Sequence, residues 1–166
     1  EAGAIRSLSW SPDSRHLASS DAERIVRFFD VESKREEAQL KGHLGQIWSV
    51  RYSPDGRRLA TGGDDFTARV WDVDQALASS IKRPDYGGGA LSLSPDNRFL
   101  ASGTVFSKRV SIRELESWKA VTGLESHQHW VPAVSYSPDG QYLATGSSDH
   151  ILKFWNTSDW RELNSI

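Results

Sequence analysis

The sequence repeats one unit four times, and this repetition limits the possible folds more than any other feature. The tripeptide Ser-Pro-Asp begins at positions 11, 53, 94 and 137, which are 42, 41 and 43 residues apart. Two further positions repeat at the same intervals, one a leucine and one a large apolar residue: Leu17, Leu59, Leu100 and Leu143, and Phe29, Trp71, Ile112 and Trp155. Three markers in one register indicate a repeat architecture.

Each unit predicts four strands. The best-formed stretch, Leu59–Val73, reads as a strand, a tight polar turn and a second strand, and its near-copies are Leu17–Val31, Leu100–Leu115 and Leu143–Thr157. The first strands should precede the tripeptide, at Ile5–Ser11, Ile47–Ser53, Ala90–Ser94 and Ala133–Ser137. Less regular fourth strands are expected near Glu36–Leu40, Ala76–Lys82, Ala120–Leu124 and Arg161–Ile166.

This pattern predicts an all-β protein. Units of about 40–45 residues with four strands each are typical of β-propeller blades, and no segment of ten or more residues shows a helical period. We expect one domain, 1–166, of four four-stranded antiparallel blades, at about 1–41, 42–83, 84–126 and 127–166. The Ser-Pro-Asp tripeptide should form the hairpin turn after each first strand, because Pro pre-sets φ and Asp bonds nearby amides. Gly56 and Gly140 complete two of these turns.

Composition excludes several functions. The net charge of −2 provides no basic field for nucleic acid, and no apolar run is long enough to span a membrane. The chain has no cysteine, so it has no disulfide framework and no thiolate chemistry, which favours a reducing, cytoplasmic compartment. It also has no methionine, so we expect it to be a piece of a longer protein.

The second unit resembles the WD40-repeat family most closely, and the resemblance extends over essentially the whole chain. The matching residues are Gly42-His43, Ser53-Pro54-Asp55-Gly56, Leu59-Ala60-Thr61-Gly62, Asp65 and Trp71-Asp72. The resemblance implies a β-propeller that acts mostly as a platform for protein interactions. It also implies a buried tetrad in which His, Ser or Thr, Asp and Trp form one hydrogen-bonded network.

Two units keep all four tetrad residues: His43, Thr61, Asp65 and Trp71 in the second, and His127, Thr145, Asp149 and Trp155 in the fourth. A buried indole N–H needs an acceptor, which the threonine hydroxyl supplies. The other two units depart from the pattern, with Glu1, Ser19, Glu23 and Phe29 in the first and Pro84, Ser102, Phe106 and Ile112 in the third. We therefore expect these two blades to be held by apolar packing alone.

Other motifs give weaker signals, and we expect no metal, no cofactor and no catalytic residue. His127, His129 and His150 are a possible metal cluster, but His127 already has a tetrad role. Asp64-Asp65 and the aspartates of the Ser-Pro-Asp turns could suggest paired carboxylates for acid–base catalysis. They lie in turns, where Asp is favoured for structural reasons. The glycines after Tyr86 precede a strand rather than the helix that a phosphate loop requires.

The candidates for partner contact are large residues on the loops beside the tetrad: Trp48, Phe66, Tyr86, Trp130 and His150. Aromatic residues dominate the binding energy of many interfaces. Packing against a neighbouring loop or blade is the alternative for each, and for Phe106 it is the favoured one. Trp118 and Trp160 precede the last strands of their units, and we expect both to pack at the outer edge of a blade.

A chain of four blades could form part of a ring or a whole ring, and we consider three arrangements. We favour a part of a longer propeller, followed by two chains that form an eight-bladed ring, and last a closed four-bladed monomer. The expected function is a non-catalytic scaffold that binds a protein or peptide. A regulatory or sensor segment of a larger signalling enzyme is the second hypothesis, and a propeller enzyme is the third.

Overall fold

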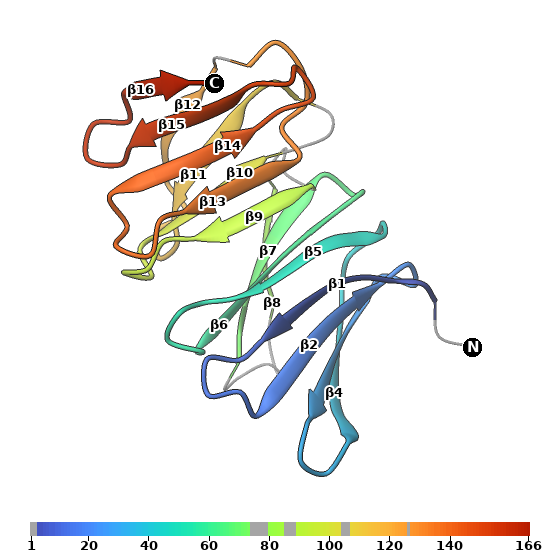
Figure 1. Ribbon diagram of the computed structural model, residues 1–166. Helices are drawn as coiled ribbons and strands as arrows, with labels where there is room; N and C mark the ends of the chain where they lie inside the picture. The colour runs from blue at the N-terminus through green and yellow to red at the C-terminus, as the bar shows by residue number, and fades with distance from the viewer. Residues whose placement is uncertain (1–2, 74–79, 85–88, 104–106, 126) are drawn as a thin grey trace.

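The computed structural model describes residues 3–73, 80–84, 89–103, 107–125 and 127–166, the stretch 80–84 for its backbone. Within these residues the chain forms sixteen strands and no helix. They make four separate four-stranded antiparallel sheets, each built from consecutive strands, so the predicted all-β fold is confirmed. The four sheets follow one another in chain order as an open arc, and the first does not meet the fourth (Figure 1).

The strands of each sheet are as follows. The first sheet contains β1 (Ile5–Trp10), β2 (His16–Asp21), β3 (Ile25–Asp30) and β4 (Arg35–Lys41). The second contains β5 (Ile47–Tyr52), β6 (Arg58–Gly63), β7 (Thr67–Asp72) and β8 (Ser80–Pro84). The third contains β9 (Ala90–Leu93), β10 (Phe99–Gly103), β11 (Val110–Glu114) and β12 (Ala120–Leu124). The fourth contains β13 (Ala133–Tyr136), β14 (Tyr142–Gly146), β15 (Leu152–Asn156) and β16 (Glu162–Ser165). We call these sheets blades one to four.

The strand predictions hold for all four blades, with small differences at the ends. The first strands stop one residue early because the tripeptide serine leaves the ladder to cap the turn. Ser53 Oγ donates to Asp55 Oδ1 at 2.6 Å and accepts a bond from the Arg58 amide at 2.9 Å. The last strand of blade two is β8, later than expected, and residues 76–79 of the predicted strand lie outside the described residues.

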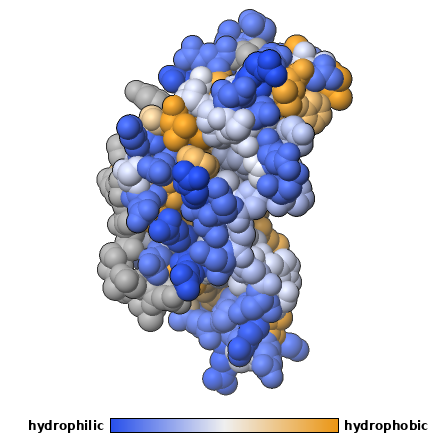
Figure 2. All heavy atoms as spheres, turned by 90° about the vertical axis from the view of Figure 1, so that its left-hand side faces the viewer, coloured by the Kyte–Doolittle hydropathy of each residue, from blue (hydrophilic) through white to orange (hydrophobic). Residues whose placement is uncertain are grey.

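The fourth residue of each Ser-Pro-Asp turn needs a left-handed backbone. Gly56 and Gly140 have φ of 73° and 72°, and Ser14 and Asn97 adopt φ of 61° and 59° at the same place. Glycine reaches this region without steric cost. These turns lie on one side of the arc, which Figure 2 faces. That side is mostly hydrophilic, and hydrophobic residues gather toward its upper end, where Figure 1 places blades three and four.

Apolar packing between consecutive blades forms the core. Blade one packs on the Trp71 face of blade two, through residues such as Val26, Phe28 and Leu40. The opposite face of blade two, with Val70, packs on blade three. Blades three and four are joined in the same way by a third cluster that contains Ile112 and Trp155. The core is therefore three seams between four blades.

A backbone hydrogen bond to a serine recurs across two of these seams. The Tyr52 amide donates to Ser9 Oγ of the preceding blade at 3.0 Å, and the Tyr136 amide donates to Ser92 Oγ at 3.0 Å. Ser135 is the counterpart of Ser9 and Ser92 on blade four. Leu8 and Trp10 on the outer face of blade one are 52% and 55% exposed.

The register of blade three corrects one sequence equivalence. Leu59 pairs with Trp71 and Leu143 with Trp155, whereas Leu100 pairs with Arg113. Arg113 therefore occupies the tetrad tryptophan position, and the prediction that Ile112 does so is wrong. The copy Leu100–Leu115 is one residue longer than the copy Leu59–Val73. That extra residue turns Ile112 to the other face, where it is fully buried against blade four.

Gly103 and Gly146 occupy equivalent positions in blades three and four, and substitutions there provide a test of how closely consecutive blades pack. A Cβ on Gly103 would lie 2.4 Å from the Val131 carbonyl oxygen of the next blade, whereas a Cβ on Gly146 meets nothing closer than 3.5 Å. We expect Gly103→Ala to lower the free energy of unfolding by about 1–3 kcal/mol, the usual cost of overpacking. Gly146→Ala should change it by less than about 0.5 kcal/mol. Urea unfolding of both variants checks this, and equal effects would contradict the packing described.

Candidate functional site: the rim beside the tetrad turns

The second blade contains a buried chain of hydrogen bonds from a tryptophan to an aspartate. Trp71 Nε1–H donates to Thr61 Oγ1 at 2.8 Å, and Thr61 Oγ1 lies 2.8 Å from His43 Nε2. His43 Nδ1 lies 3.0 Å from both Asp65 oxygens. Because the indole is donor-only, the threonine accepts from it and donates to Nε2, and Nδ1–H then donates to Asp65. The structure thus brings the four predicted residues together in this order.

The charges of this chain follow from burial and bonding. Burial lowers the pKa of the His43 imidazole, and this outweighs the neighbouring Asp65, which acts to raise it. Burial acts to raise the pKa of Asp65, but bonds from the Leu44 amide, Thr67 and His43 outweigh it and hold that pKa below its ordinary value. The pair is therefore a neutral imidazole beside a carboxylate at neutral pH, which is the state that the bonding order requires.

The fourth blade repeats the arrangement. Trp155 Nε1–H donates to Thr145 Oγ1 at 3.0 Å, and Thr145 Oγ1 lies 2.8 Å from His127 Nε2. His127 Nδ1 lies 3.1 Å from Asp149 Oδ2, which also accepts from the Gln128 amide at 2.7 Å. These bonds hold the pKa of Asp149 well below its ordinary value against the effect of burial, which acts to raise it. Each network ties a loop before the blade to two of its strands.

Blade one has an ionic network in place of the tetrad, so the expectation of apolar packing alone is wrong there. Asp21 accepts from the amides of Glu23 at 2.8 Å and Ile25 at 3.1 Å, and Arg27 Nε lies 3.2 Å from it. The same guanidinium bonds Glu23 at 3.2 Å and Glu36 at 3.3 Å. Asp21 aligns with Gly63 of blade two and not with the tetrad aspartate Asp65. The sequence comparison therefore gave it no role.

Blade three has no tetrad among its described members. Ser102 is buried, and Arg113 fills the tryptophan position, with its guanidinium 5.7 Å from the Trp118 ring and bonded to the Trp118 carbonyl at 3.1 Å. The apolar-only expectation is therefore wrong for this blade too. Phe106, the Pro84 side chain and Glu1 of blade one lie outside the described residues.

Trp48 lies in β5 and not on a loop as predicted. With it, four of the five candidates for partner contact lie on the rim formed by the tetrad turns, the loops between blades and the start of β5. We call this surface the tetrad rim, and its members are Trp48, Phe66, Trp130 and His150. Tyr86 lies outside the described residues. Trp118 and Trp160, in contrast, pack on blades. Trp118 is buried in the seam between blades two and three, and the Trp160 ring meets Phe99 edge-on at 6.2 Å.

Trp48 is held by contacts with two neighbouring side chains. Its ring is 39% exposed, and the Arg6 guanidinium of blade one lies over it at 4.7 Å. Its indole N–H donates to the Asp64 carboxylate, and Arg6 also donates to Gln46 Oε1 at 3.0 Å. Any partner at Trp48 therefore meets a ring whose N–H is already bonded and whose one face is covered by a cation.

Phe66 and His150 occupy the same place in the turn that carries the tetrad aspartate. Both have a left-handed backbone, with φ of 58° and 69°, and both are exposed, Phe66 by 51%. A side chain with Cβ costs about 1–2 kcal/mol in this conformation. Trp130, 48% exposed, lies beside the turn of His150 in blade four, because its carbonyl accepts from the Ser148 amide at 2.9 Å. The His129 ring meets its indole at 5.1 Å.

The sequence predicts no metal site, although it contains one possible cluster of histidines. His127, His129 and His150 do not form a metal-binding group in the part of the chain that the structure describes. One group there has suitable geometry, namely His16, Asp30 and Glu37 at the Ser-Pro-Asp side of blade one. Sequence reasoning missed it because the three residues are spread over three strands. The described residues also include no helix long and apolar enough to cross a membrane.

Comparison with known proteins agrees with the geometry. The family model for the WD domain, G-beta repeat, matches residues 1–30, 34–72 and 118–156, more than half of the chain. The chain belongs to the WD40-repeat family. Its propeller-type blades and tetrads are those that the sequence resemblance implied, and WD40 domains mediate protein–protein interactions.

Curated relatives match parts of the chain. Protein HIR1 of Mycosarcoma maydis is 37% identical over 76 residues, 46% of this chain and 7% of that protein. A Periodic tryptophan protein 2 homolog of Mus musculus is 30% identical over 81 residues, 49% of this chain and 9% of that protein. Lissencephaly-1 homolog 1 of Paramecium tetraurelia is 29% identical over 59 residues, 32% of this chain and 15% of that protein. The matched stretches thus span a small part of each relative.

The buried histidine predicts how stability depends on pH. The folded-state pKa of His43 lies below its ordinary value of 6.5. The unfolded chain therefore takes up the proton first as the pH falls, and the free energy of unfolding should decrease from about pH 6.5 downward. Asp65, whose folded pKa is lowered from 3.8, adds a second loss as the pH falls below about 4.

Urea unfolding at about pH 7.5 and about pH 5.5 measures the first loss, and variants identify its source. His43→Gln should be less stable at both values, and it should lose less stability between them than the natural chain. His150→Ala, which removes an exposed imidazole, serves as the control for the loss of one histidine. An equal loss in His43→Gln and the natural chain would show that His43 is not the titrating group.

Proposed function

We propose that this chain is a non-catalytic scaffold that presents the tetrad rim to a protein or peptide partner in the cytoplasm. The observation that carries the proposal is the exposure of four large side chains on this one rim, two of them on turns whose backbone disfavours such residues. The His, Thr and Asp sets that resemble catalytic groups are bonded to one another inside the blades. They serve to hold the rim in place.

Rigidity supports this role. Each tetrad fixes its turn from inside, so Phe66 and His150 are held in one backbone conformation before any partner arrives. A preformed surface loses less conformational entropy on binding than a mobile one. Phe66 and His150 are exposed at positions where Asn or Gly would fit the left-handed turn at lower cost, so both side chains are available to a partner. Trp48 is the weaker contact candidate, because Arg6 and Asp64 already engage it.

Binding can be tested with peptides selected from a displayed random library on the immobilised chain. Phe66→Asn should raise the free energy of unfolding by up to about 1 kcal/mol, because Asn tolerates the left-handed backbone. The same change, and Trp130→Ala, should each weaken the selected peptides by about tenfold or more, the scale of a hot-spot truncation. Fluorescence anisotropy measures the affinity and urea unfolding the stability.

The control is Tyr142→Ala, which removes a side chain of similar exposure at the Ser-Pro-Asp side. It should leave the affinity unchanged. If Trp130→Ala and Phe66→Asn bind like the natural chain while Tyr142→Ala loses binding, the peptides use the other rim and the assignment fails. Trp48→Ala should have a smaller effect than Trp130→Ala.

The outer faces of blades one and four support a second part of the proposal, namely that each accepts a further WD40-type blade. Blade one presents Trp10, the counterpart of Tyr52 and Tyr136, which pack on the preceding blade at the internal seams. Blade four presents Ser135, the counterpart of the serines that accept across those seams. Gly146 leaves room where Gly103 meets the next blade's backbone. Blades of a longer chain fit both faces, and a second copy that completes an eight-bladed ring fits them too.

Sedimentation velocity over a range of concentrations tests closure by a second copy. That alternative predicts a species of twice the 18.5 kDa chain mass, and it predicts that Gly146→Ala weakens association without lowering the stability of the monomer. Trp10→Ser should weaken it as well. A mass of one chain at every concentration would exclude the two-copy ring and leave further blades of a longer chain as the occupant.

A further inference from the structure

Three ligating side chains meet at the Ser-Pro-Asp side of blade one. His16 begins β2, Asp30 ends β3 directly opposite it in the ladder, and Glu37 lies in β4 beyond. One ligand atom from each lies within 4.8 Å of the other two, and His16 Nε2 is 3.4 Å from Glu37 Oε2. Three adjacent strands of one sheet thus supply an imidazole and two carboxylates to the same point.

A β-bulge places the third residue. Phe28 pairs with Ala38 and Phe29 with Glu36, so Glu37 is the extra residue that the ladder skips. A bulge re-aims a side chain relative to the regular alternation of a strand. Here it brings the Glu37 carboxylate across to β2. Residue spacing in the sequence does not reveal this, because the bulge appears only in the strand pairing.

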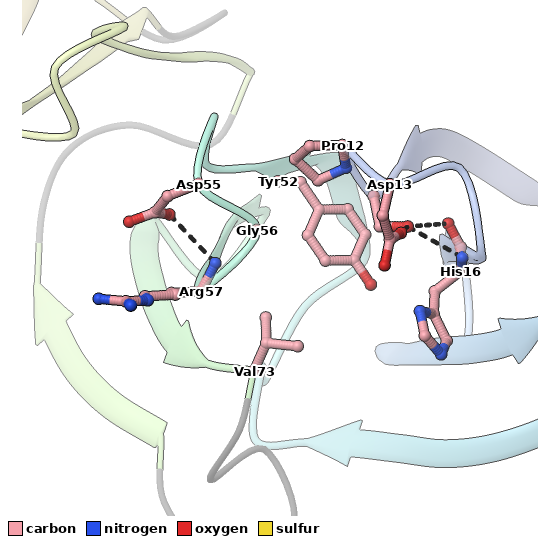
Figure 3. Close-up of a pocket in the computed structure, with 9 residues that line it drawn as sticks. Pro12, Asp13, His16, Tyr52, Asp55, Gly56, Arg57 and Val73 are labelled. Carbon is pink, nitrogen blue, oxygen red and sulfur yellow. Dashed lines mark hydrogen bonds between the residues drawn. The ribbon is translucent and has the colours of Figure 1, made fainter.

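The surroundings are rich in negative charge. His16 lines a cavity of about 390 Å³ between blades one and two, together with Asp13, Asp55 and Tyr52 (Figure 3). Burial raises the pKa of the Tyr52 hydroxyl to about 12, and the carboxylates of Asp13 and Glu37 add to the effect. The nearby cations are Arg15, Arg57 and Arg35, which pairs with Asp30 in the ladder, and Arg57 points away from His16 (Figure 3). The carboxylates near His16 therefore favour a positive ion.

We propose that His16, Asp30 and Glu37 form a site for a divalent transition-metal ion, with zinc as the ion that its donor set suits best. Imidazole nitrogen and carboxylate oxygen are both zinc ligands, whereas magnesium and calcium prefer oxygen alone. Ligand atoms around a tetrahedral zinc at about 2.0–2.2 Å from the ion are roughly 3.4 Å apart. The His16–Glu37 separation already has this value.

The other blades show that the fold does not require these three side chains. At the equivalent positions blade three has Phe99, Glu114 and Val121, and blade four has Tyr142, Asn156 and Leu163. The same bulge occurs in both, so Val121 and Leu163 occupy the place of Glu37. The ligand set is therefore particular to blade one. It lies on the side opposite the tetrad rim, so it adds a second, separate site.

Isothermal titration with zinc chloride on the chelator-treated chain tests the site. We expect one ion per chain. The variants replace each ligand by the residue of a sister blade: His16→Phe, Glu37→Val and Asp30→Asn. Each should weaken zinc binding by at least about tenfold. Asp30→Asn is the most informative variant, because it removes the charge and should keep the turn. Asp30 accepts the Ser33 amide at 2.6 Å, and Asn156 accepts the Ser158 amide at 2.8 Å in the equivalent turn of blade four.

Two controls make the result decisive. His129→Ala and His150→Ala remove exposed imidazoles elsewhere and should keep the natural affinity. Thermal unfolding with zinc should show a higher midpoint for the natural chain and no shift for Asp30→Asn, and magnesium should produce no shift in either. Natural affinity in all three ligand variants would overturn the proposal. So would a loss of binding confined to His129→Ala or His150→Ala, which would identify an adventitious ion only.

Discussion

Burial of one apolar sheet face against the next is the interaction on which this structure depends. No blade covers its own two faces, so each is stabilised by its neighbours, and the three seams supply the apolar core. The polar networks act inside this frame. The tetrads of blades two and four and the Asp21–Arg27 network of blade one attach the turns to sheets that the seams already hold.

The sequence predicted the fold because the signals that define a blade are local and occur four times. Turn chemistry and period alone place nearly every strand. The errors arise where one residue changes the register. The longer turn of blade three moves Arg113 into the position assigned to Ile112. In blade one, Asp21 has no counterpart among the tetrad residues, so the sequence pattern did not predict its network. Glu37 meets His16 only through a bulge, which depends on strand pairing and has no short sequence signal.

The two sides of the arc differ in how their side chains are used. On the tetrad rim, buried bonds fix the turns and leave Phe66, Trp130 and His150 exposed. On the Ser-Pro-Asp side, the turns bond to themselves through Ser and Asp. The variable residues beside them, such as His16 or Tyr142, are then under little constraint from the fold. Separate functions can therefore evolve on the two sides without disturbing the seams.

The serine that accepts a bond from the following blade gives two of the three seams a direction. Ser9 and Ser92 face forward along the chain, and the amides of Tyr52 and Tyr136 face back. The two joined surfaces differ, so two copies related by a two-fold axis must form this contact twice, as in a closed ring. A head-to-tail contact of this kind either closes into a ring or continues as a filament. A further blade on the Ser135 face would also block such a filament.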